Sequence, residues 1–395
     1  MDMMIQREKL EQARGILEEQ GIDCWLTFAR ETSETPDPVM DLIVGHDVTW
    51  QSAFIVTRDG KRIAIVGGPD RGLITQAGQY DTLYTYNRGI TPVLRAVMRE
   101  VEPQQIAINY SRGDVASDGL THGMYLQLVA ALAHSPYRQR LISAAPIIAA
   151  LRSRKTATEL KRMREAIRIT EEMFAKVTPF LRPGRSEREM AGMLHAEVKR
   201  RGLVTSWQAN ACPAVNAGAS SEAGHGGPTD IVMQAGDLIH LDFGIIYEDY
   251  CSDLQRMWFL RGEGQMEPPE EVTRAFRACV GAIEAGRKKL KAGVQGYQVD
   301  AVARAYLTDK GFPEYMHALG HSVGRAVHDG GPLIGPRWER YGETPERPIE
   351  PSSVYTLELG AATARGYIGL EDEVLVSASG ATWLSTAQTE LMLAG

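Results

Sequence analysis

The chain has 395 residues and a mass of 43.5 kDa, a length that predicts two or three domains. Apolar residues make up 44% of the sequence and charged residues 24%, which excludes a disordered chain and a disulfide-framework protein. The formal net charge of −7 gives no electrostatic reason to expect a nucleic acid or an anionic membrane as a partner.

Cysteine spacing and hydropathy indicate the compartment. The four cysteines are too far apart for a CxxC or zinc-finger motif, so we expect reduced thiols at Cys24, Cys212, Cys251 and Cys279. The N-terminal segment lacks an apolar run of signal-peptide length, and no run of about 18 uncharged apolar residues occurs. These features predict a cytoplasmic protein without a membrane partner.

Residues 1–150 alternate helical and extended patterns, which predicts an α/β domain. The first helix ends before Gly21, and Asp59-Gly60 is a dipeptide that favours a hairpin turn. The expected elements, in chain order, are a helix over 5–19, strands over 24–29, 53–57 and 61–67, a helix over 90–101, a strand over 105–111 and a helix over 124–133. No catalytic constellation is recognisable in this half of the chain.

A domain boundary is expected close to residue 150, so that 151–395 form a second domain. A T-x-x-E capping box that begins at Thr156 predicts a long helix as far as Pro183, and a second box at Ser186 opens the next helix. Beyond it, the patterns predict helices over 268–291 and 296–310 and strand-rich stretches over 205–260 and 354–376.

Two segments of the second domain are expected to set carboxylates across from one another. Asp242 and Asp253 are equidistant from position 247.5, so a hairpin folded there places them directly opposite each other. Glu358 and Glu371 repeat this pattern about position 364.5. Opposed residues in an antiparallel pair have Cβ atoms about 5 Å apart. Each hairpin is therefore expected to present a facing pair of acids.

Facing acids need a compensating charge, because like charges opposed across a sheet are destabilising and their burial costs more. A metal cation is the simplest source of that charge. The alternative is that these acids are solvated strand residues paired with Arg256 or Arg365, in hairpins whose register can slip.

Imidazoles cluster in the same half of the chain. Five of the nine histidines lie at or beyond residue 225, and three of them fall within twelve positions, at His317, His321 and His328. The glycines among them permit unusual backbone conformations. Four carboxylates and one imidazole make a hard, oxygen-rich site for two divalent ions, better suited to Mn, Co, Fe or Zn than to a metal that prefers thiolates.

With these residues the chain resembles the pita-bread metallopeptidase superfamily, which contains methionine aminopeptidase, aminopeptidase P, prolidase and creatinase. The superfamily pattern is an Asp, a second Asp 11 positions on, a His in a G-H-x-x-G context and two Glu, which fall here at Asp242, Asp253, His321, Glu358 and Glu371. The resemblance covers about 156–395. It implies an α/β (α+β) protein with an N-terminal creatinase-like domain over 1–150 and a C-terminal pita-bread domain over 151–395, in which helices flank an antiparallel sheet.

The resemblance also implies roles in a two-metal site, with manganese favoured and Co, Zn or Fe as alternatives. Asp242 would bind one ion, Asp253 and Glu371 would bridge both, and His321 and Glu358 would complete the coordination of the second ion. A hydroxide between the ions would attack the scissile carbonyl.

In the same comparison, Glu358 would be the proton shuttle, and the histidines that contact substrate would be His225, His317 and His328. The implied activity is that of an Xaa-Pro dipeptidase or Xaa-Pro aminopeptidase acting on small peptides or amides.

Three positions depart from the pattern of proline-directed members. Leu359 stands where Pro is usual, Gly369 where Arg is usual and Gln255 where Thr is usual. Two further hypotheses therefore remain: the same fold and metals acting on a non-peptide small molecule, or a catalytically silent peptide-binding scaffold. The complete ligand set speaks against the scaffold and against metal-free creatinase-like hydrolysis.

The N-terminal domain is expected to help form a homodimer and to wall the active site, as prolidase-like relatives imply. Ala29–Trp50 is a long polar loop followed by an apolar run, the kind of segment that often carries binding function. The alternative is a disordered surface loop with a buried Trp50.

Overall fold

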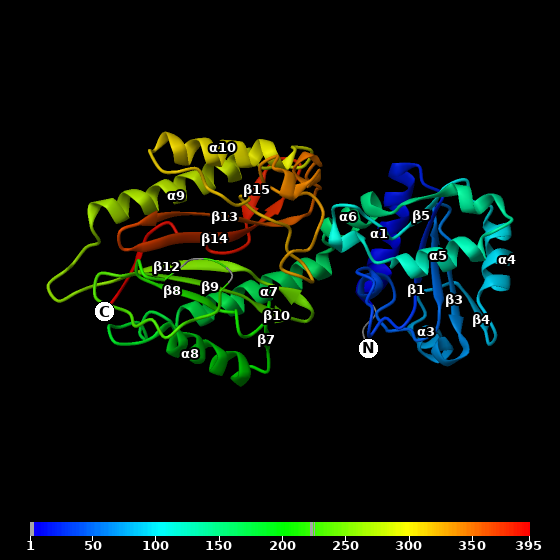
Figure 1. Cartoon of the computed structure of the whole chain (residues 1–395), viewed down its shortest axis with the longest axis horizontal. Coiled ribbons are helices and arrows are strands. Elements are labelled where there is room, and N and C mark those ends of the chain that lie inside the picture. The colour runs from blue at the N-terminus through cyan, green and yellow to red at the C-terminus, as the bar shows by residue number, and fades with distance from the viewer. Residues whose placement is uncertain (1–3, 222–223, 225) are drawn as a thin grey trace. The chain divides into compact units, whose positions relative to one another are not determined.

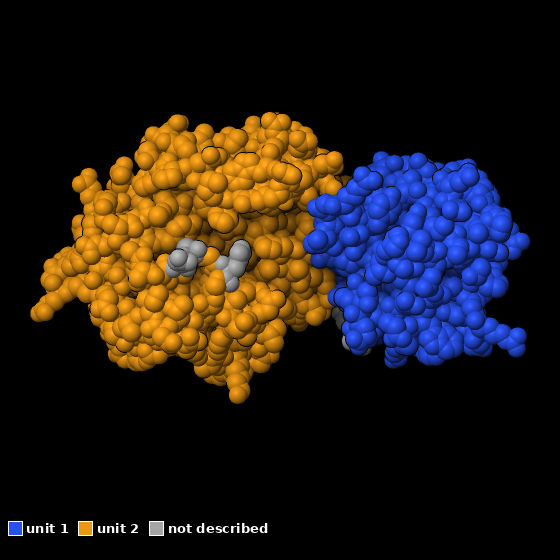
Figure 2. Space-filling model, in the orientation of Figure 1, with its two compact units in different colours: residues 1–152 blue, residues 153–395 orange. Residues whose placement is uncertain are grey.

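The computed structural model describes residues 4–221, 224 and 226–395 (Figure 1). The chain divides into two compact units, Met1–Arg152 and Ser153–Gly395, which are called unit 1 and unit 2 below (Figure 2). Both units combine a sheet with helices, so the expected mixed α/β fold class is confirmed.

Unit 1 is built on a six-stranded mixed sheet with the order β4-β3-β2-β1-β5-β6. Its strands are β1 (Cys24–Ala29), β2 (Ser52–Thr57), β3 (Arg62–Gly67), β4 (Thr82–Tyr86), β5 (Ile106–Ile108) and β6 (Leu141–Ser143). Its helices are α1 (Met4–Gln20), α2 (Met40–Ile43), α3 (Arg71–Ala77), α4 (Thr91–Val101), α5 (His122–Ala131) and α6 (Ala145–Ser153). Every residue of β1 is buried, because two apolar clusters take up its alternate side chains.

Local sequence signals explain where these elements end. α1 stops before Gly21, whose φ of 67° is in the left-handed region that glycine tolerates. The loop of the β2–β3 hairpin covers residues 58–61, and Gly60 within it has a φ of 95°. The strand predicted over 105–111 is shorter than expected, because the chain turns at Tyr110, whose N–H donates to the carbonyl of Ile108 at 2.8 Å.

The longer helices of unit 2 are α7 (Ala157–Phe174), α8 (Glu187–Arg200), α9 (Glu270–Lys289) and α10 (Gly296–Asp309). The first two, α7 and α8, begin at the predicted capping boxes. Thr156 and Ser186 both form the reciprocal capping hydrogen bonds. The prediction that α7 continues to Pro183 is wrong. The chain leaves the helix after Phe174 in tight turns that bury Val177.

Unit 2 contains a seven-stranded sheet with the path β13-β14-β12-β9-β8, to which β15 adds beside β14 and β16 beside β12. Its strands are β8 (Ala214–Ala217), β9 (Leu238–Phe243), β12 (Leu254–Leu260), β13 (Val354–Thr363), β14 (Gly366–Val376), β15 (Ala381–Trp383) and β16 (Met392–Ala394). A small second sheet joins β7 (Val204–Thr205), β10 (Ile245–Tyr247) and β11 (Tyr250–Cys251).

Helices cover unit 2 on opposite outer sides, with α9 and α10 over β13 and β14 and with α8 against β8 (Figure 1). Alternation along the strands separates the apolar core from the acids. Ile239 and Leu241 of β9 belong to the cluster around α7 and α8, whereas Leu357 and Leu359 of β13 pack in the cluster around α9. The carboxylates alternate with these core residues, so they face neither helix layer.

Two general features follow from this fold. Among the helices that the structure describes, none is both long enough and apolar enough to traverse a lipid bilayer. All four cysteines are free and buried, and burial raises the pKa of each thiol to about 12. None of the four thiols is poised as a nucleophile.

Candidate metal centre

The β9–β12 hairpin carries both aspartates, in a register that differs from the predicted one. Asp242 lies directly opposite Gln255, so the prediction that it faces Asp253 is wrong. The chain reverses at Glu248 and Asp249, whose φ values of 44° and 68° are those of a two-residue hairpin turn. This turn moves the hairpin centre one position along the chain. Asp253 nevertheless remains close to Asp242, and besides burial the charge of Asp242 contributes to raising the pKa of Asp253.

The β13–β14 hairpin has the predicted register, with Glu358 directly opposite Glu371. β14 also pairs with β12, where Glu371 lies opposite Gln255. Asp242, Gln255, Glu371 and Glu358 therefore form one row across four neighbouring strands. Directly opposed residues share a face of the sheet, so this row gathers three carboxylates around one amide.

His321 reaches this row because its segment runs alongside β13. The N–H of Thr356 donates to the carbonyl of His321 at 2.9 Å, and the N–H of Glu358 donates to the carbonyl of Leu319 at 2.6 Å. A Cβ at Gly320 would overlap the carbonyl of Thr356. This glycine is therefore needed for close approach of the two backbones.

The imidazole of His321 is oriented as a metal ligand. Its Nδ1 lies 2.9 Å from the carbonyl oxygen of Val327, which can only accept, so Nδ1 carries the hydrogen and donates it. In the neutral ring Nε2 then presents a lone pair. That atom lies 3.6 Å from Glu371 Oε1 and 3.7 Å from both Asp253 Oδ2 and Glu358 Oε1. Donors that share one tetrahedral ion at about 2.1 Å lie about 3.4 Å apart, close to these separations.

The acids lack the partners that buried carboxylates need. Asp242 Oδ1 and Glu371 Oε1 are buried without a hydrogen-bond partner among the described residues. Burial raises the pKa of Asp242, Asp253 and Glu358 well above the ordinary value, and the charge of Glu371 is the next cause in each case. A divalent cation would relieve both problems, so this donor set fits the implied metal.

A subset of these donors meets the geometric requirement directly. Asp253, His321 and Glu371 can each offer one ligand atom, and the three atoms lie within 4.8 Å of one another. All three donors are oxygen or imidazole nitrogen, which suits a hard or borderline divalent cation.

Arginine does not neutralise the row, contrary to the alternative considered for the sequence. Arg256 Nη2 pairs with Asp372 Oδ1 at 2.8 Å, and both side chains are buried. Burial raises the pKa of Asp372 to about 6 although Arg256 acts in the opposite direction. The positive charge of Arg365 acts on Asp237.

The structure describes two of the three auxiliary histidines that the resemblance indicated. The ring of His328 meets that of His321 edge to face, with centroids 4.4 Å apart. The ring of His317 lies 5.4 Å from that of Tyr315. Burial, and then the charge of Glu358, raises the pKa of Tyr315, so this pair adjoins the acidic row. His225 lies outside the described residues.

Three contributors were missed in the sequence: Gln255, Glu373 and Tyr315. Gln255, read there only as a departure, donates from Nε2 to Glu371 Oε2 at 2.9 Å and to Glu358 Oε2 at 3.2 Å. Glu373 accepts a hydrogen bond from the backbone N–H of Asp253 at 2.9 Å. Its place two residues after Glu371, on the same strand face, was the available signal. Tyr315 had no such signal.

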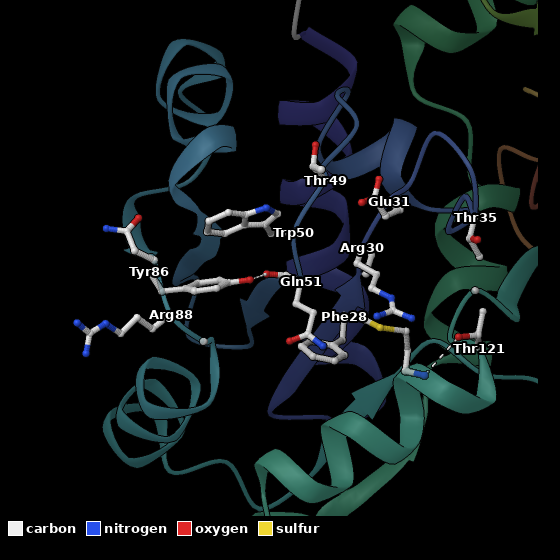
Figure 3. Close-up of a pocket in the computed structure, with 15 residues that line it drawn as sticks. Phe28, Arg30, Glu31, Thr35, Thr49, Trp50, Gln51, Tyr86, Arg88 and Thr121 are labelled. Atoms are coloured by element: carbon white, nitrogen blue, oxygen red, sulfur yellow. Dashed lines mark hydrogen bonds between the residues drawn. The ribbon is translucent and has the colours of Figure 1, made fainter.

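A separate cavity of about 630 Å³ lies in unit 1 and is lined partly by the segment Ala29–Trp50 (Figure 3). The rings of Trp50 and Tyr86 lie 5.8 Å apart, and the hydroxyl of Tyr86 donates to the carbonyl of Gln51 at 2.8 Å. Trp50 is 38% exposed and α2 forms within the segment, which contradicts the alternative of a disordered loop with a buried tryptophan.

Comparisons with known proteins agree with this geometry. A sequence model of Metallopeptidase family M24 matches residues 161–378. The uncharacterized peptidase YqhT of Bacillus subtilis is 28% identical over 278 residues, which are 70% of this chain and 73% of that protein. An Xaa-Pro dipeptidase of Pyrococcus horikoshii is 26% identical over 252 residues, or 62% of this chain and 66% of that protein.

Solved structures extend the similarity to the whole chain. The structure of an Xaa-Pro dipeptidase from Bacillus anthracis matches with a TM-score of 0.74 at 25% identity, and the match covers 98% of this chain and 99% of that one. The structure of the dipeptidase PepE from Mycobacterium ulcerans has a TM-score of 0.75 at 23% identity, covering 100% and 99%. At that identity the second match bears on the fold alone.

Proposed function

Because the chain belongs to metallopeptidase family M24, we propose that it is a two-metal peptidase that hydrolyses the Xaa-Pro bond of dipeptides or other short peptides. The observation that carries this proposal is the convergence of carboxylate oxygens from Asp253, Glu358 and Glu371 on His321 Nε2, at 3.6 to 3.7 Å. The relatives named as Xaa-Pro dipeptidases support the choice of substrate.

The ligand set follows from the row of acids. We assign Asp242 to one ion, Asp253 and Glu371 to a bridging position between two, and His321 with Glu358 to the second. The unpartnered oxygens of Asp242 and Glu371 support this assignment. Manganese is proposed because oxygen donors outnumber the single imidazole nitrogen.

When bound, divalent ions supply Lewis acidity, which polarises the scissile carbonyl and lowers the pKa of water. The chain supplies the proton transfers. Glu358 takes a proton from the attacking water and delivers it to the leaving nitrogen, since a carboxylate beside the reacting atoms can accept a proton and return it. His317 and His328 orient the substrate and donate hydrogen bonds to the oxyanion.

For unit 1 we propose that it forms a homodimer contact and restricts the active site to short substrates, in a cytoplasmic enzyme. The exposed Trp50 and the cavity beside it support a binding role, since aromatic side chains near a polar cavity are typical of recognition surfaces.

The deciding experiment combines metal analysis with a substrate panel. The purified chain is stripped, reloaded with Mn, Co, Zn or Fe, and assayed on Xaa-Pro dipeptides, Xaa-Ala dipeptides and Xaa-Pro-Yaa tripeptides. Preference for Xaa-Pro dipeptides indicates a dipeptidase, and cleavage of the tripeptides indicates an aminopeptidase. A chain that binds metal but hydrolyses none of these peptides would indicate a non-peptide substrate. Failure to bind any ion would contradict it.

A further inference from the structure

Gln255 lies at the centre of the acidic row. It gives the two carboxylate oxygens of each neighbouring glutamate different surroundings. Its Nε2 donates to the Oε2 atoms of Glu358 and Glu371, at 3.2 and 2.9 Å. The opposite oxygens, Oε1 of each residue, are those that lie 3.7 and 3.6 Å from His321 Nε2. One amide therefore holds one oxygen of each carboxylate and leaves the other turned toward the imidazole.

The orientation of this amide is fixed by what surrounds it. Carboxylates that bind a metal are ionised and can only accept, so the NH₂ group of Gln255 faces them and its Oε1 faces the other way. Gln255 Oε1 lies 2.8 Å from His240 Nε2. An oxygen needs a donor, so His240 carries a hydrogen on Nε2.

The chain of hydrogen bonds continues beyond His240. The structure places Asn216 Oδ1 2.9 Å from His240 Nδ1, and Asn216 Nδ2 3.1 Å from the hydroxyl of Ser221. With the hydrogen of His240 on Nε2, Nδ1 accepts, so the Asn216 amide is reassigned with its NH₂ group toward Nδ1, which the hydroxyl of Ser221 permits because it can donate or accept. Asn216, His240 and Gln255 are exposed by only 7%, 6% and 9%, which makes each of these bonds expensive to leave unmade.

Gly369 supplies the space for this arrangement. A Cβ at that position would lie 2.6 Å from His240 Nε2 and 2.7 Å from Gln255 Oε1, closer than real contacts allow. No larger residue at 369 is compatible with the His240–Gln255 hydrogen bond. The two unusual residues at 255 and 369 are thus parts of one arrangement, joined through His240.

We propose that Asn216, His240 and Gln255 are positioning residues that orient the carboxylates of Glu358 and Glu371 toward the metals. The absence of a side chain at Gly369 leaves the space that these residues require. This inference rests on the metal site of the proposed function. Gln255 acts on the ligands directly, and His240 acts through Gln255 by keeping its amide from rotating. Neighbours of metal ligands that fix ligand orientation typically contribute about 10- to 100-fold to metal affinity.

The test measures metal binding to the intact chain. Mn²⁺ titrations by calorimetry, at one fixed pH, compare wild type with Gln255→Met and His240→Leu. Each substitution removes the side-chain hydrogen bonds and introduces an apolar side chain of similar size. Both variants should bind Mn²⁺ about 10- to 100-fold more weakly. Their Co²⁺ forms should show altered visible absorption, because the coordination geometry changes. The double variant should lose little more than either single one, since each breaks the same chain.

Two further variants separate positioning from general damage. His240→Gln keeps a side-chain NH₂ that can donate to Gln255, so it should recover part of the affinity that His240→Leu loses. His195→Gln is the matched control, because this part-buried histidine of unit 2 bonds the carbonyl of Cys212 at 2.7 Å and, among the residues that the structure describes, no carboxylate. It should bind Mn²⁺ like wild type. Circular dichroism of the metal-free proteins checks that each variant folds. If His240→Leu does not fold, the test relies on Gln255→Met and His240→Gln.

The outcomes are distinguishable. Folded Gln255→Met and His240→Leu variants that keep wild-type Mn²⁺ affinity and Co²⁺ absorption would overturn the positioning role and leave the metal site standing. A wild-type chain that binds neither ion would overturn the proposed function and this inference with it.

Discussion

Glu358 and Glu371 lie directly opposite each other in the β13–β14 ladder, and each turns one oxygen toward the same imidazole nitrogen of His321. Two acids in this position repel one another unless a cation lies between them. The mutual orientation of these two carboxylates therefore favours a bound cation between them.

Asp253→Asn should abolish the metal-dependent activity while leaving the fold intact. The substitution removes one negative charge from the position that we assign to bridging, and lost metal stabilisation of several kcal/mol lowers turnover by at least about 100-fold. Metal content by mass spectrometry should fall in parallel, with an unchanged circular dichroism spectrum. Wild-type turnover together with wild-type metal content would exclude the bridging role.

His328→Ala should lower kcat by about 100-fold and leave metal content unchanged, as expected when one donor to the oxyanion is removed. His317→Ala should behave in the same way. His195→Gln serves again as the control with full activity. Because the ring of His328 lies 4.4 Å from that of His321, metal loss in His328→Ala would show that it supports the ligand instead of the substrate.

Asp37→Asn should stabilise unit 1 in a pH-dependent way. Burial raises the pKa of Asp37 from 3.8 to about 6, against hydrogen bonds from Asn109 and Val39 that lower it. Between these values the unfolded chain releases a proton that the folded chain retains, so this group makes wild type less stable as pH rises from about 4 to about 6. Asp37→Asn has no ionisable group at this position, so its free energy of unfolding lacks this decrease.

The difference in free energy of unfolding between Asp37→Asn and wild type should therefore grow over this window and stay constant above pH 6, reaching on the order of 1 to 3 kcal/mol. Urea titrations at several pH values measure it. The exposed Asp309 provides the control as Asp309→Asn. A difference that does not change with pH would mean that Asp37 is ionised throughout.

The four thiols should resist Ellman's reagent in the native protein and react only with unfolding. They are buried, and burial raises the pKa of each to about 12, so the reactive thiolate is scarce. Full reaction after addition of guanidinium chloride gives the total. Rapid reaction of even one thiol in folded protein would contradict the burial.

The intact chain should scatter light as a dimer of about 87 kDa, twice the chain mass of 43.5 kDa. Trp50→Ala should raise the rate on pentapeptides relative to dipeptides, because Trp50 lines the cavity of unit 1 with 38% of its surface exposed. Leu126→Ala, exposed elsewhere in unit 1, is the control. A monomer, or a Trp50→Ala variant with unchanged length preference, would exclude this role for unit 1.

The sequence by itself indicated many of the elements and the residues that we propose as metal donors. Capping boxes marked the starts of α7 and α8 because those hydrogen bonds form within four residues. The pairing of Glu358 with Glu371 followed from symmetry about a short turn, and the motif around His321 indicated a metal. These signals are local, so no knowledge of distant contacts was needed.

Only the tertiary structure decided how the donors meet. The turn at Glu248 and Asp249 shifted the β9–β12 register by one position and placed Gln255 opposite Asp242, because two left-handed residues fit there without glycine. The contact of Gln255 with His240, and the space left by Gly369, also depend on the pairing of β12 with β14, which no local pattern encodes. Side chains that act through such pairings acquire their role from the sheet register, which long-range packing sets.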